Sequence, residues 1–492
     1  MLKINLEEHV KNQCLFRIIH YDTGNRYEGE FKNDLREGYG ILYFISGDKY
    51  IGQFKNNLKE GYGICYYSNG TKYVGEFKNN KLEGLGAYYY SNGSKYLGEL
   101  KNNKREGYGI KYYINGDIYQ GEYKNGFKDG YGIKYYFSFG DKYIGRYKKG
   151  VKDGFGIKCS SYDDKYVGNW KNDFKNGFGV LFYKNGGIYE GQFKNNKLEG
   201  YGKLYYKNGD KYLGEFKKNK REGYGVKYNI NGDKYEGQWK NNKRQDYGIK
   251  IKSTGDKYEG GFKYNKREGY GLYYYKNGSK YKGQWKNNKC EGYGIYYHFN
   301  GEKYNGLWMN DIREGYGIYK CINGDIYKGE WKIDVVEGYG IIYFANGGRY
   351  EGQLKNRKKE GYGVYYYSTG DKFEGEYKNS LKEGYGIYYY SNGDKFEGKW
   401  KNNNREGYGM YYYSNENRYE YGFYNNKENG DDENENDLPS LGFQYKEYFK
   451  QEKINNSNYK MLSIIKYFYS MFINKKITIF FIIILIFGLL IN

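Results

Sequence analysis

Hydrophobic and polar residues alternate along most of this chain, and the alternating pattern recurs every 23 residues. The stretch 50–72 reads "YIGQFKNNLKEGYGICYYSNGTK", and a closely similar phrase starts at Tyr73. Every second residue of the segments 50–54 and 62–66 is aromatic, aliphatic or glycine. A period of two residues is typical of β-strands rather than helices. The pattern therefore predicts short strands throughout the repeated region.

A fixed repeat of this length decides the fold prediction. With the first tyrosine of each phrase taken as position 1, seventeen repeats cover residues 27–418, with one extra residue just before Tyr143. Residues 1–26 precede them as an N-terminal cap with a partial repeat. Apolar residues make up only 38% of the chain, whereas aromatic residues reach 22%. We therefore expect the buried surface to consist mainly of aromatic rings.

Two turns per repeat are expected to fold these strands into antiparallel hairpins. Positions 20 and 21 are Asn-Gly in 11 of the 17 repeats, which favours a type I′ turn with positive φ at both residues. A five-residue loop, Asn56–Glu60 in the quoted repeat, is expected to make the other connection. Both connections would place the same side chains on one buried face. In the quoted repeat these are Tyr50, Phe54, Tyr62, Ile64 and Tyr66.

The glycines are expected to serve the backbone of this hairpin. Gly52 leaves a gap on the buried face, across which neighbouring rings should lie. Gly61 should close the five-residue loop at positive φ, and Gly63, on the opposite face from the buried rings, should permit close approach of the facing strand. Two departures predict local irregularity, namely Asp246, which replaces the glycine of the loop, and Ser160–Lys165, which lacks the turn glycine.

The repeated phrase resembles the membrane occupation and recognition nexus (MORN) repeat over about four fifths of the chain. The resemblance rests on Tyr50, Gly52, Phe54, Gly61, Tyr62, Gly63 and Gly70. It implies an all-β fold, an elongated single-layer antiparallel β-meander solenoid of 23-residue hairpins that serves as a scaffold.

The C-terminal region differs in composition. Residues 419–460 hold a decayed repeat and the acidic run "KENGDDENENDLPS", which is typical of a disordered linker. Residues 461–476 place polar side chains at helical spacing and predict an amphipathic juxtamembrane helix. Residues 477–491 carry no charge and predict a transmembrane tail anchor about 23 Å long.

The charges that flank this segment predict its orientation. Lys475 and Lys476 precede it and no charge follows, so the positive-inside rule places the repeats in the cytosol. The endoplasmic reticulum or another secretory membrane is the expected host. This layout of repeats and a C-terminal anchor resembles that of junctophilins, which tether the endoplasmic reticulum to the plasma membrane.

The balance of 81 basic against 59 acidic residues, a net charge of +22, suggests an anionic partner. Lysine recurs at position 6, and each basic residue near an anionic membrane contributes about 1 kcal/mol. Charges in such a pattern more usually form a solvated rim that keeps the sheet edges and loops soluble. Nucleic acid is not expected, because glutamate recurs in nearly every repeat and the tyrosines are needed for packing. The candidate lipid contacts are Lys55, Lys78, Lys101, Lys466, Lys475 and Lys476.

The motifs of catalysis and metal binding are not found. "GYG" lacks the spacing of a dinucleotide fingerprint, and the five cysteines and three histidines follow no periodic pattern. We therefore expect no catalytic, cofactor or metal site. The function predicted is a non-enzymatic, membrane-anchored scaffold or tether to another membrane or to cytoskeletal proteins. The alternative is a regulatory or targeting subunit that recruits a separate enzyme such as a lipid kinase; protein partners are expected and homo-oligomerisation stays open.

Overall fold

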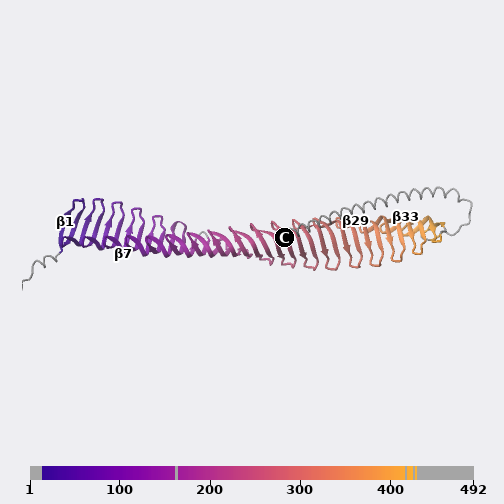
Figure 1. The fold of residues 1–492 in the computed structure, drawn as a ribbon, viewed down its shortest axis with the longest axis horizontal. Coiled ribbons are helices and arrows are strands. Elements are labelled where there is room, and N and C mark those ends of the chain that lie inside the picture. Colours follow the sequence, from indigo (N-terminus) through magenta and orange to yellow (C-terminus); the bar gives the residue numbers. More distant parts are fainter. Residues whose placement is uncertain (1–13, 161–163, 416–417, 425–426, 429–492) are drawn as a thin grey trace, which may run out of the picture. The chain divides into compact units, whose positions relative to one another are not determined.

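The computed structural model describes residues 14–160, 164–415, 418–424 and 427–428. The chain divides into two compact parts at Lys243 and Arg244, called here the N-terminal half and the C-terminal half. Both are built from antiparallel strands in which each strand pairs with its sequence neighbour (Figure 1). Within the described residues, the one helical element is a short 3-10 turn, η1. The prediction of an all-β antiparallel meander is confirmed for each half.

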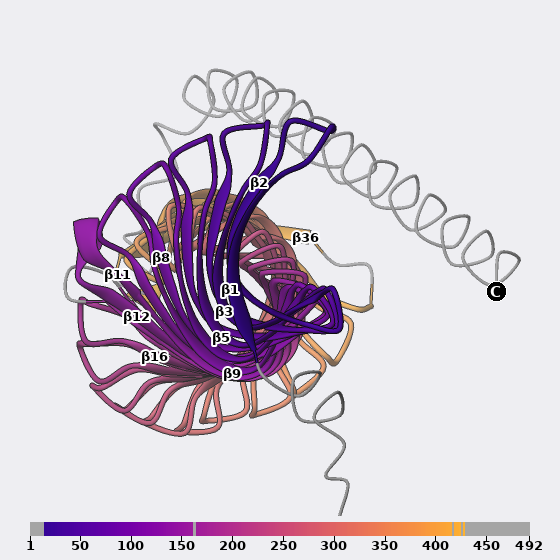
Figure 2. The same ribbon diagram turned by 90° about the vertical axis from the view of Figure 1, so that its left-hand side faces the viewer.

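The N-terminal half contains β1 (Leu15–His20), β2 (Arg26–Lys32), β3 (Leu35–Tyr43), β4 (Lys49–Lys55), β5 (Leu58–Tyr66), β6 (Lys72–Lys78), β7 (Lys81–Tyr89), β8 (Lys95–Lys101), β9 (Lys104–Tyr112), β10 (Ile118–Lys124), β11 (Phe127–Tyr136), η1 (Phe137–Phe139), β12 (Asp141–Lys148), β13 (Val151–Cys159), β14 (Lys165–Lys171), β15 (Phe174–Phe182), β16 (Ile188–Lys194), β17 (Lys197–Tyr205), β18 (Lys211–Lys217), β19 (Lys220–Tyr228) and β20 (Lys234–Lys240). Figure 2 shows its successive strands fanning out by small angles, as the natural twist of β-sheets requires.

The C-terminal half contains β21 (Lys243–Ile251), β22 (Lys257–Lys263), β23 (Lys266–Tyr274), β24 (Lys280–Lys286), β25 (Lys289–Tyr297), β26 (Lys303–Met309), β27 (Ile312–Lys320), β28 (Ile326–Lys332), β29 (Val335–Tyr343), β30 (Arg349–Lys355), β31 (Lys358–Tyr366), β32 (Lys372–Lys378), β33 (Leu381–Tyr389), β34 (Lys395–Lys401), β35 (Asn404–Tyr412), β36 (Arg418–Tyr424) and β37 (Lys427–Glu428). Most repeats thus supply a seven-residue strand followed by a nine-residue strand.

The connection inside each repeat is a two-residue turn, so the predicted five-residue loop is wrong. In β4 and β5, Lys55 pairs with Leu58 across Asn56 and Asn57. These two asparagines have φ values of 47° and 68°, which is the left-handed pair of a type I′ turn. Asparagine tolerates this conformation better than most residues. The tightest turn is therefore made by Asn-Asn.

The connection between repeats is a three-residue loop, so the predicted type I′ turn at Asn-Gly is also wrong. The N–H of Tyr67 donates to the carbonyl of Thr71 at 2.9 Å, and the N–H of Gly70 donates to the carbonyl of Tyr67 at 3.0 Å. Gly70 has a φ of 83°, whereas Asn69 keeps a negative φ. A tight turn closed by one left-handed glycine is the usual three-residue hairpin loop.

These two turns shift the register by one residue and reverse the predicted face of the second strand. Tyr62 and Tyr66 are 62% and 39% exposed, and Ile64 is only half-buried. Cys65 is buried instead, because Cys65, and not Tyr66 as predicted, pairs with Tyr50. A one-residue shift moves every side chain of a strand to the other face.

A bulge within the second strand accommodates the shift. Gly52 pairs with Gly63 and Phe54 with Lys59, so Glu60, Gly61 and Tyr62 together face Gln53. Gly61 has a φ of 65°. Its predicted positive φ is confirmed, but it lies in the bulge and not in a loop.

The core lies on one face of the sheet, called here the ring face, which carries Tyr50, Phe54, Lys59, Gly63 and Cys65 in the quoted repeat. The ring of Tyr50 is fully buried and lies over the glycine pair, which confirms the ring expected across Gly52. Its hydroxyl donates to the carbonyl of Gln53 at 2.9 Å. Edge-on ring contacts join it to Phe54 at 5.1 Å and to Phe77 of the next repeat at 4.9 Å. Such contacts recur from repeat to repeat and stabilise neighbours against each other.

Two predicted irregularities have different outcomes. Asp246 adopts a φ of 55° and pairs with Phe262 as Gly61 pairs with Phe77, so the irregularity predicted there is wrong. Aspartate, like asparagine, reaches the left-handed region at modest cost. The turn after β13 falls partly in 161–163, outside the described residues.

The predicted C-terminal elements fall mostly outside the described residues. The linker beyond residue 428, the helix 461–476 and the anchor 477–491 lie outside the described residues, whereas the start of the decayed repeat forms β36. Across the residues that the structure describes, no helix is long and apolar enough to cross a membrane. At the other end, β1 of the N-terminal cap pairs with β2.

Candidate functional surfaces

Lysines at position 6 form an exposed edge beside the Asn-Asn turns, called here the lysine edge. Except for Lys32, which is half-buried, all are exposed. None has an ion-pair partner among the residues that the structure describes. The lysine edge comprises Lys32, Lys55, Lys78, Lys101, Lys124, Lys148, Lys171, Lys194, Lys217 and Lys240 in the N-terminal half, and Lys263, Lys286, Lys332, Lys355, Lys378 and Lys401 in the C-terminal half.

The acidic side chains near this edge are held by the backbone. A carboxylate oxygen of Glu60 accepts the N–H of Asn79 at 2.9 Å. At position 4, Glu99 accepts the N–H of Tyr108 in the bulge at 3.0 Å. These carboxylates thus stabilise turns and bulges, whereas the lysine ammonium groups extend freely into solvent. The predicted Lys55, Lys78 and Lys101 all lie on the lysine edge; Lys466, Lys475 and Lys476 lie outside the described residues.

Exposed aromatic side chains accompany the lysine edge on the face opposite the ring face, called here the outer face. Sequence reasoning assigned them to the core and so missed them. In the register of the hairpin, position 13 falls on the outer face, and Tyr131 is 61% exposed there. This tyrosine stripe comprises Tyr39, Tyr62, Tyr108, Tyr131, Tyr201, Tyr224, Tyr247, Tyr270, Tyr293, Tyr316 and Tyr408.

On the ring face, a lysine or arginine from position 10 lies over the rings of its own and the next repeat. The ammonium of Lys59 is 4.8 Å from the ring centroid of Tyr50 and 5.8 Å from that of Phe77. Burial lowers the pKa of Lys59, and it lowers the pKa of Lys128, Lys359 and Lys382 to about 8. The ammonium groups stay over the rings despite this burial, because the faces of aromatic rings attract cations.

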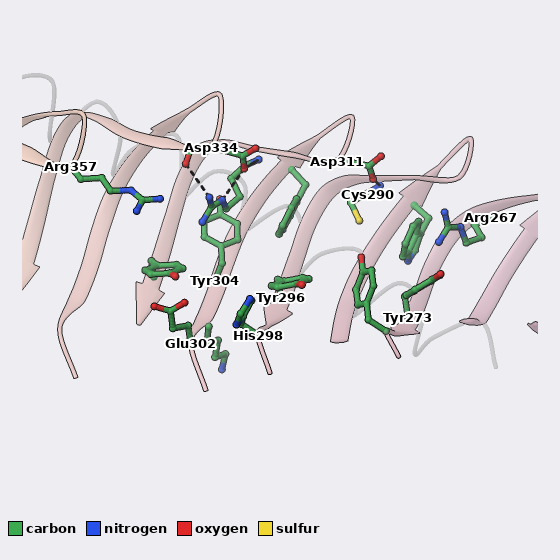
Figure 3. A pocket seen from close by; sticks show the side chains of 16 residues that line it. Arg267, Tyr273, Cys290, Tyr296, His298, Glu302, Tyr304, Asp311, Asp334 and Arg357 are labelled. Atoms are coloured by element: carbon green, nitrogen blue, oxygen red, sulfur yellow. Dashed lines mark hydrogen bonds and ion pairs between the residues drawn. The ribbon is translucent and has the colours of Figure 1, made fainter. Parts of the chain in front are cut away.

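The C-terminal half contains a hollow of about 620 Å³ on its ring face (Figure 3). Cys290 and Asp311 lie on one side of it, and His298 and Glu302 on the other. Cys290 occupies position 10, where most repeats carry a lysine or arginine. Hydrogen bonds from Asn300 and Tyr319 lower the pKa of the Glu302 carboxyl, so Glu302 is charged at neutral pH. The hollow arises where a long side chain is replaced by a short one.

The described residues offer no cluster of side chains suited to a metal ion. Nowhere among them do three histidine, cysteine, aspartate or glutamate side chains converge as metal ligands. All five cysteines are free thiols, and burial raises the pKa of Cys65 and Cys290. A thiol with a raised pKa is a poor nucleophile at neutral pH.

Comparison with protein families identifies the repeats. A family model described as "MORN repeat" matches seventeen segments, which begin at the repeat starts found above, although the fifth and sixth end early, at residues 138 and 161. They are 27–49, 50–72, 73–95, 96–118, 119–138, 143–161, 166–188, 189–211, 212–234, 235–257, 258–280, 281–303, 304–326, 327–349, 350–372, 373–395 and 396–418. No curated protein sequence matches the chain.

Two solved structures are among those that match the chain. The TCP domain of Drosophila melanogaster SAS-4, in complex with a proline-rich motif of Ana2, is 13% identical, with 41% of this chain and 90% of that chain covered and a TM-score of 0.20. The TCP10 domain of Danio rerio CPAP is 10% identical, with 50% and 93% covered and a TM-score of 0.13. At these scores neither likeness bears on fold or function.

Proposed function

We propose that this chain, which belongs to the MORN repeat family, is a membrane-bound scaffold whose repeats contact anionic phospholipids through the lysine edge. MORN proteins form a family of repeat scaffolds, and this chain offers a long series of identical surface groups rather than one site. Binding through many weak, equal contacts suits such a surface.

The lysine edge is the observation that carries the proposal. It repeats at every second strand within each half, a spacing of about 10 Å, which is of the order of the distance between lipid headgroups. Each lysine near an anionic surface contributes about 1 kcal/mol, so several in one half would bind where one would not. The tyrosine stripe on the adjoining outer face supports the same proposal, because tyrosine rings favour the membrane–water interface.

The C-terminal sequence supports a second membrane contact. Residues 477–491 have the composition of a tail anchor, and Lys466, Lys475 and Lys476 would lie against the headgroups of the host membrane. With the repeats in the cytosol, an anchor in an endoplasmic reticulum or other secretory membrane and a lysine edge on another membrane together make a tether. Cytoskeletal proteins, a separate enzyme such as a lipid kinase, or a second copy of the chain are alternative partners for the same scaffold.

Liposome sedimentation tests the lipid contact. A chain that ends at residue 460 lacks the proposed anchor and retains every described residue. We expect it to bind phosphatidylserine liposomes at low salt and not phosphatidylcholine liposomes. Binding should weaken steeply as salt rises, because the Debye length falls from about 10 Å at 0.1 M to about 3 Å at 1 M.

The contrary outcomes are equally specific. Failure to bind phosphatidylserine at low salt would disprove the lipid contact, and salt-independent binding would assign it to the tyrosine stripe instead. Retrieval of a cytoskeletal protein by a chain that ignores both liposomes would favour the protein-binding alternative.

A further inference from the structure

Tryptophan occurs at a single position of the repeat, and its environment is almost invariant. All six tryptophans occupy position 5 on the ring face. Five are covered by the cation at position 10 of the preceding repeat. The cation-to-ring distances are 4.8 Å for Lys152 over Trp170, 4.2 Å for Arg221 over Trp239, 4.0 Å for Arg267 over Trp285, 4.5 Å for Arg313 over Trp331 and 4.5 Å for Lys382 over Trp400.

Trp308 is the exception, because position 10 of the preceding repeat is Cys290. No cation lies over its ring among the described residues. The other five tryptophans are buried, whereas Trp308 is only half-buried. Its indole N–H still donates to the carbonyl of Gly294 at 3.1 Å, as that of Trp285 donates to Gly271 at 3.3 Å. The ring is therefore held in the usual place, and without a cation over it Trp308 lines the hollow.

The polar group that binds the position-10 arginine in the next repeat has an equivalent beside Cys290. In the next repeat, Arg313 donates from Nε to the Asp334 carboxylate at 2.8 Å and from a terminal nitrogen to the Asp334 carbonyl at 3.0 Å. The equivalent residue beside Cys290 is Asp311, whose carboxylate accepts the N–H of Cys290 at 2.6 Å. Asp311 is exposed and forms no ion pair within the described chain. The Cys290 thiol is hydrogen-bonded to the same carboxylate, which has lone pairs left for a further donor.

The charges around the hollow permit a cation. Its ring-face lining has the cations Arg267, Arg313 and Arg357 balanced by the carboxylates Glu302, Asp311 and Asp334. Lys303, also at its border, extends to the outer face, where its ammonium lies 5.1 Å from the Tyr297 ring. An incoming cation thus meets a ring-face lining without net positive charge.

From these contacts we propose that the hollow at Cys290 binds an arginine side chain presented by a partner polypeptide, with the guanidinium stacked on Trp308 and hydrogen-bonded to Asp311. Arginine is favoured over lysine because its planar guanidinium stacks on indole and donates to a carboxylate at the same time. The other tryptophans cannot accept such a group, since the chain's own cations occupy their faces. The site lies on the ring face and does not depend on lipid binding at the lysine edge.

Fluorine NMR of the full-length protein in detergent, with 5-fluorotryptophan incorporated, tests the proposal. Trp308→Phe identifies the resonance of Trp308 among the six. Titration with the tripeptide Gly-Arg-Gly should shift that resonance saturably and leave the other five unchanged. Gly-Lys-Gly should bind at least several-fold more weakly, and Gly-Glu-Gly should produce no shift.

Variants copied from other repeats give matched controls. Cys290→Arg, which recreates the arrangement at Arg267, should move the Trp308 resonance without peptide and abolish the response to Gly-Arg-Gly. Cys290→Ser keeps the hollow and should retain the response. Asp311→Asn should weaken binding while preserving the fold, because Asn288 accepts the backbone N–H of Arg267 in the same way at 2.8 Å.

The proposal is overturned if Gly-Arg-Gly leaves the Trp308 resonance unmoved, or if the other tryptophans respond to the same degree. It is also overturned if tetramethylammonium shifts the resonance more strongly than Gly-Arg-Gly, since the site would then select a quaternary ammonium such as a choline headgroup. If Cys290→Arg does not fold, the response of Asp311→Asn decides: unchanged affinity contradicts the proposal, and weakened affinity supports it.

Discussion

Gly52 lies directly opposite Gly63 where β4 pairs with β5, and together they make room for the ring of Tyr50. A Cβ atom at Gly63 would lie 2.5 Å from the Cε2 atom of Tyr50, much closer than two non-bonded carbon atoms approach. Because the tyrosine ring lies flat over two backbones without side chains, it can be fully buried in a sheet only one layer thick. The glycine pair is thus a packing requirement of the core.

Gly63→Ala should destabilise its hairpin by about 1–3 kcal/mol, the usual cost of overpacking a core. Each repeat contacts only its neighbours, so the damage should stay local. Hydrogen exchange should show protection lost in β4, β5 and the adjoining strands and retained in β16 and β17. Gly187→Ser is the control, because Ser94 occupies the same repeat position. Loss of protection throughout the N-terminal half would contradict local coupling.

The sequence pattern predicted the strands, their antiparallel order and aromatic rings across Gly52, but neither the register nor the place of Gly63 on the ring face. Asn-Gly and Asn-Asn both form turns readily. The prediction placed the two-residue type I′ turn at Asn-Gly, whereas the structure has it at Asn-Asn. The error of one residue could not be detected from composition, because both faces of the second strand carry aromatic or aliphatic residues. Gly63 was a better signal. A position that faces the Tyr50 ring has no room for a side chain and must therefore be glycine.

The candidate surfaces were predictable to different extents. Lysine at position 6 recurs so regularly that the lysine edge was evident before the structure, since turn-flanking residues are exposed in either register. The hollow at Cys290 was not, because an isolated cysteine is uninformative. Only the structure shows that position 10 lies over position 5 of the next repeat. Thereafter the sequence signal is plain: each tryptophan except Trp308 follows a lysine or arginine by eighteen residues.

Tyr147→Phe should be neutral or stabilise the protein by up to about 1 kcal/mol. Tyr147 is 4% exposed, and its hydroxyl has no hydrogen-bond partner, so removing the hydroxyl relieves a desolvation cost. Position 5 carries phenylalanine in other repeats, as at Phe54. Tyr143→Phe is the contrasting variant, because the Tyr143 hydroxyl donates to the Arg146 carbonyl at 3.1 Å, and it should cost about 1 kcal/mol. Urea unfolding compares the two; equal losses would indicate a partner for Tyr147.

Lys128→Leu should stabilise the N-terminal half at pH 7 by about 1–2 kcal/mol, after allowance for the lost attraction of the Tyr119 and Tyr147 rings. Burial, together with the charge of Lys134, lowers the pKa of Lys128 from 10.5 to about 8 in the folded protein. Between pH 8 and 10.5 the unfolded chain therefore binds more protons at this group, and stability rises with pH. Leucine is native to this position at Leu198.

Urea unfolding at pH 7 and pH 9.5 measures this effect. The wild type should gain stability between the two values, and Lys128→Leu should gain less. The exposed Lys124→Leu is the control and should behave as the wild type. Measurements stop below pH 10, because burial raises the pKa of Tyr119 and its ionisation in the unfolded chain then lowers stability. An identical gain in wild type and Lys128→Leu would show that Lys128 carries no charge penalty.

Charge reversal on the lysine edge separates additive binding to a membrane from binding at one site. At about 1 kcal/mol per unit of charge, Lys55→Glu alone, which changes the charge by two, should weaken binding to phosphatidylserine liposomes by no more than about thirtyfold. Six simultaneous reversals in the N-terminal half should abolish it. The set to be changed to glutamate is Lys55, Lys78, Lys101, Lys124, Lys148 and Lys171.

A second set of six lysines supplies the control with the same net charge. These lysines precede the first tyrosine of a repeat and lie at the opposite end of the strands from the lysine edge; the ammonium of Lys72, for example, lies 5.2 Å from the Tyr66 ring. The control set is Lys72, Lys95, Lys142, Lys165, Lys211 and Lys234. If the lysine edge contacts the membrane, its reversal should abolish liposome binding at 0.1 M salt, whereas reversal of the control set should leave measurable binding that salt still weakens. Equal loss in both variants would mean that net charge alone attracts the protein, and the lysine edge would then have no special part in membrane contact.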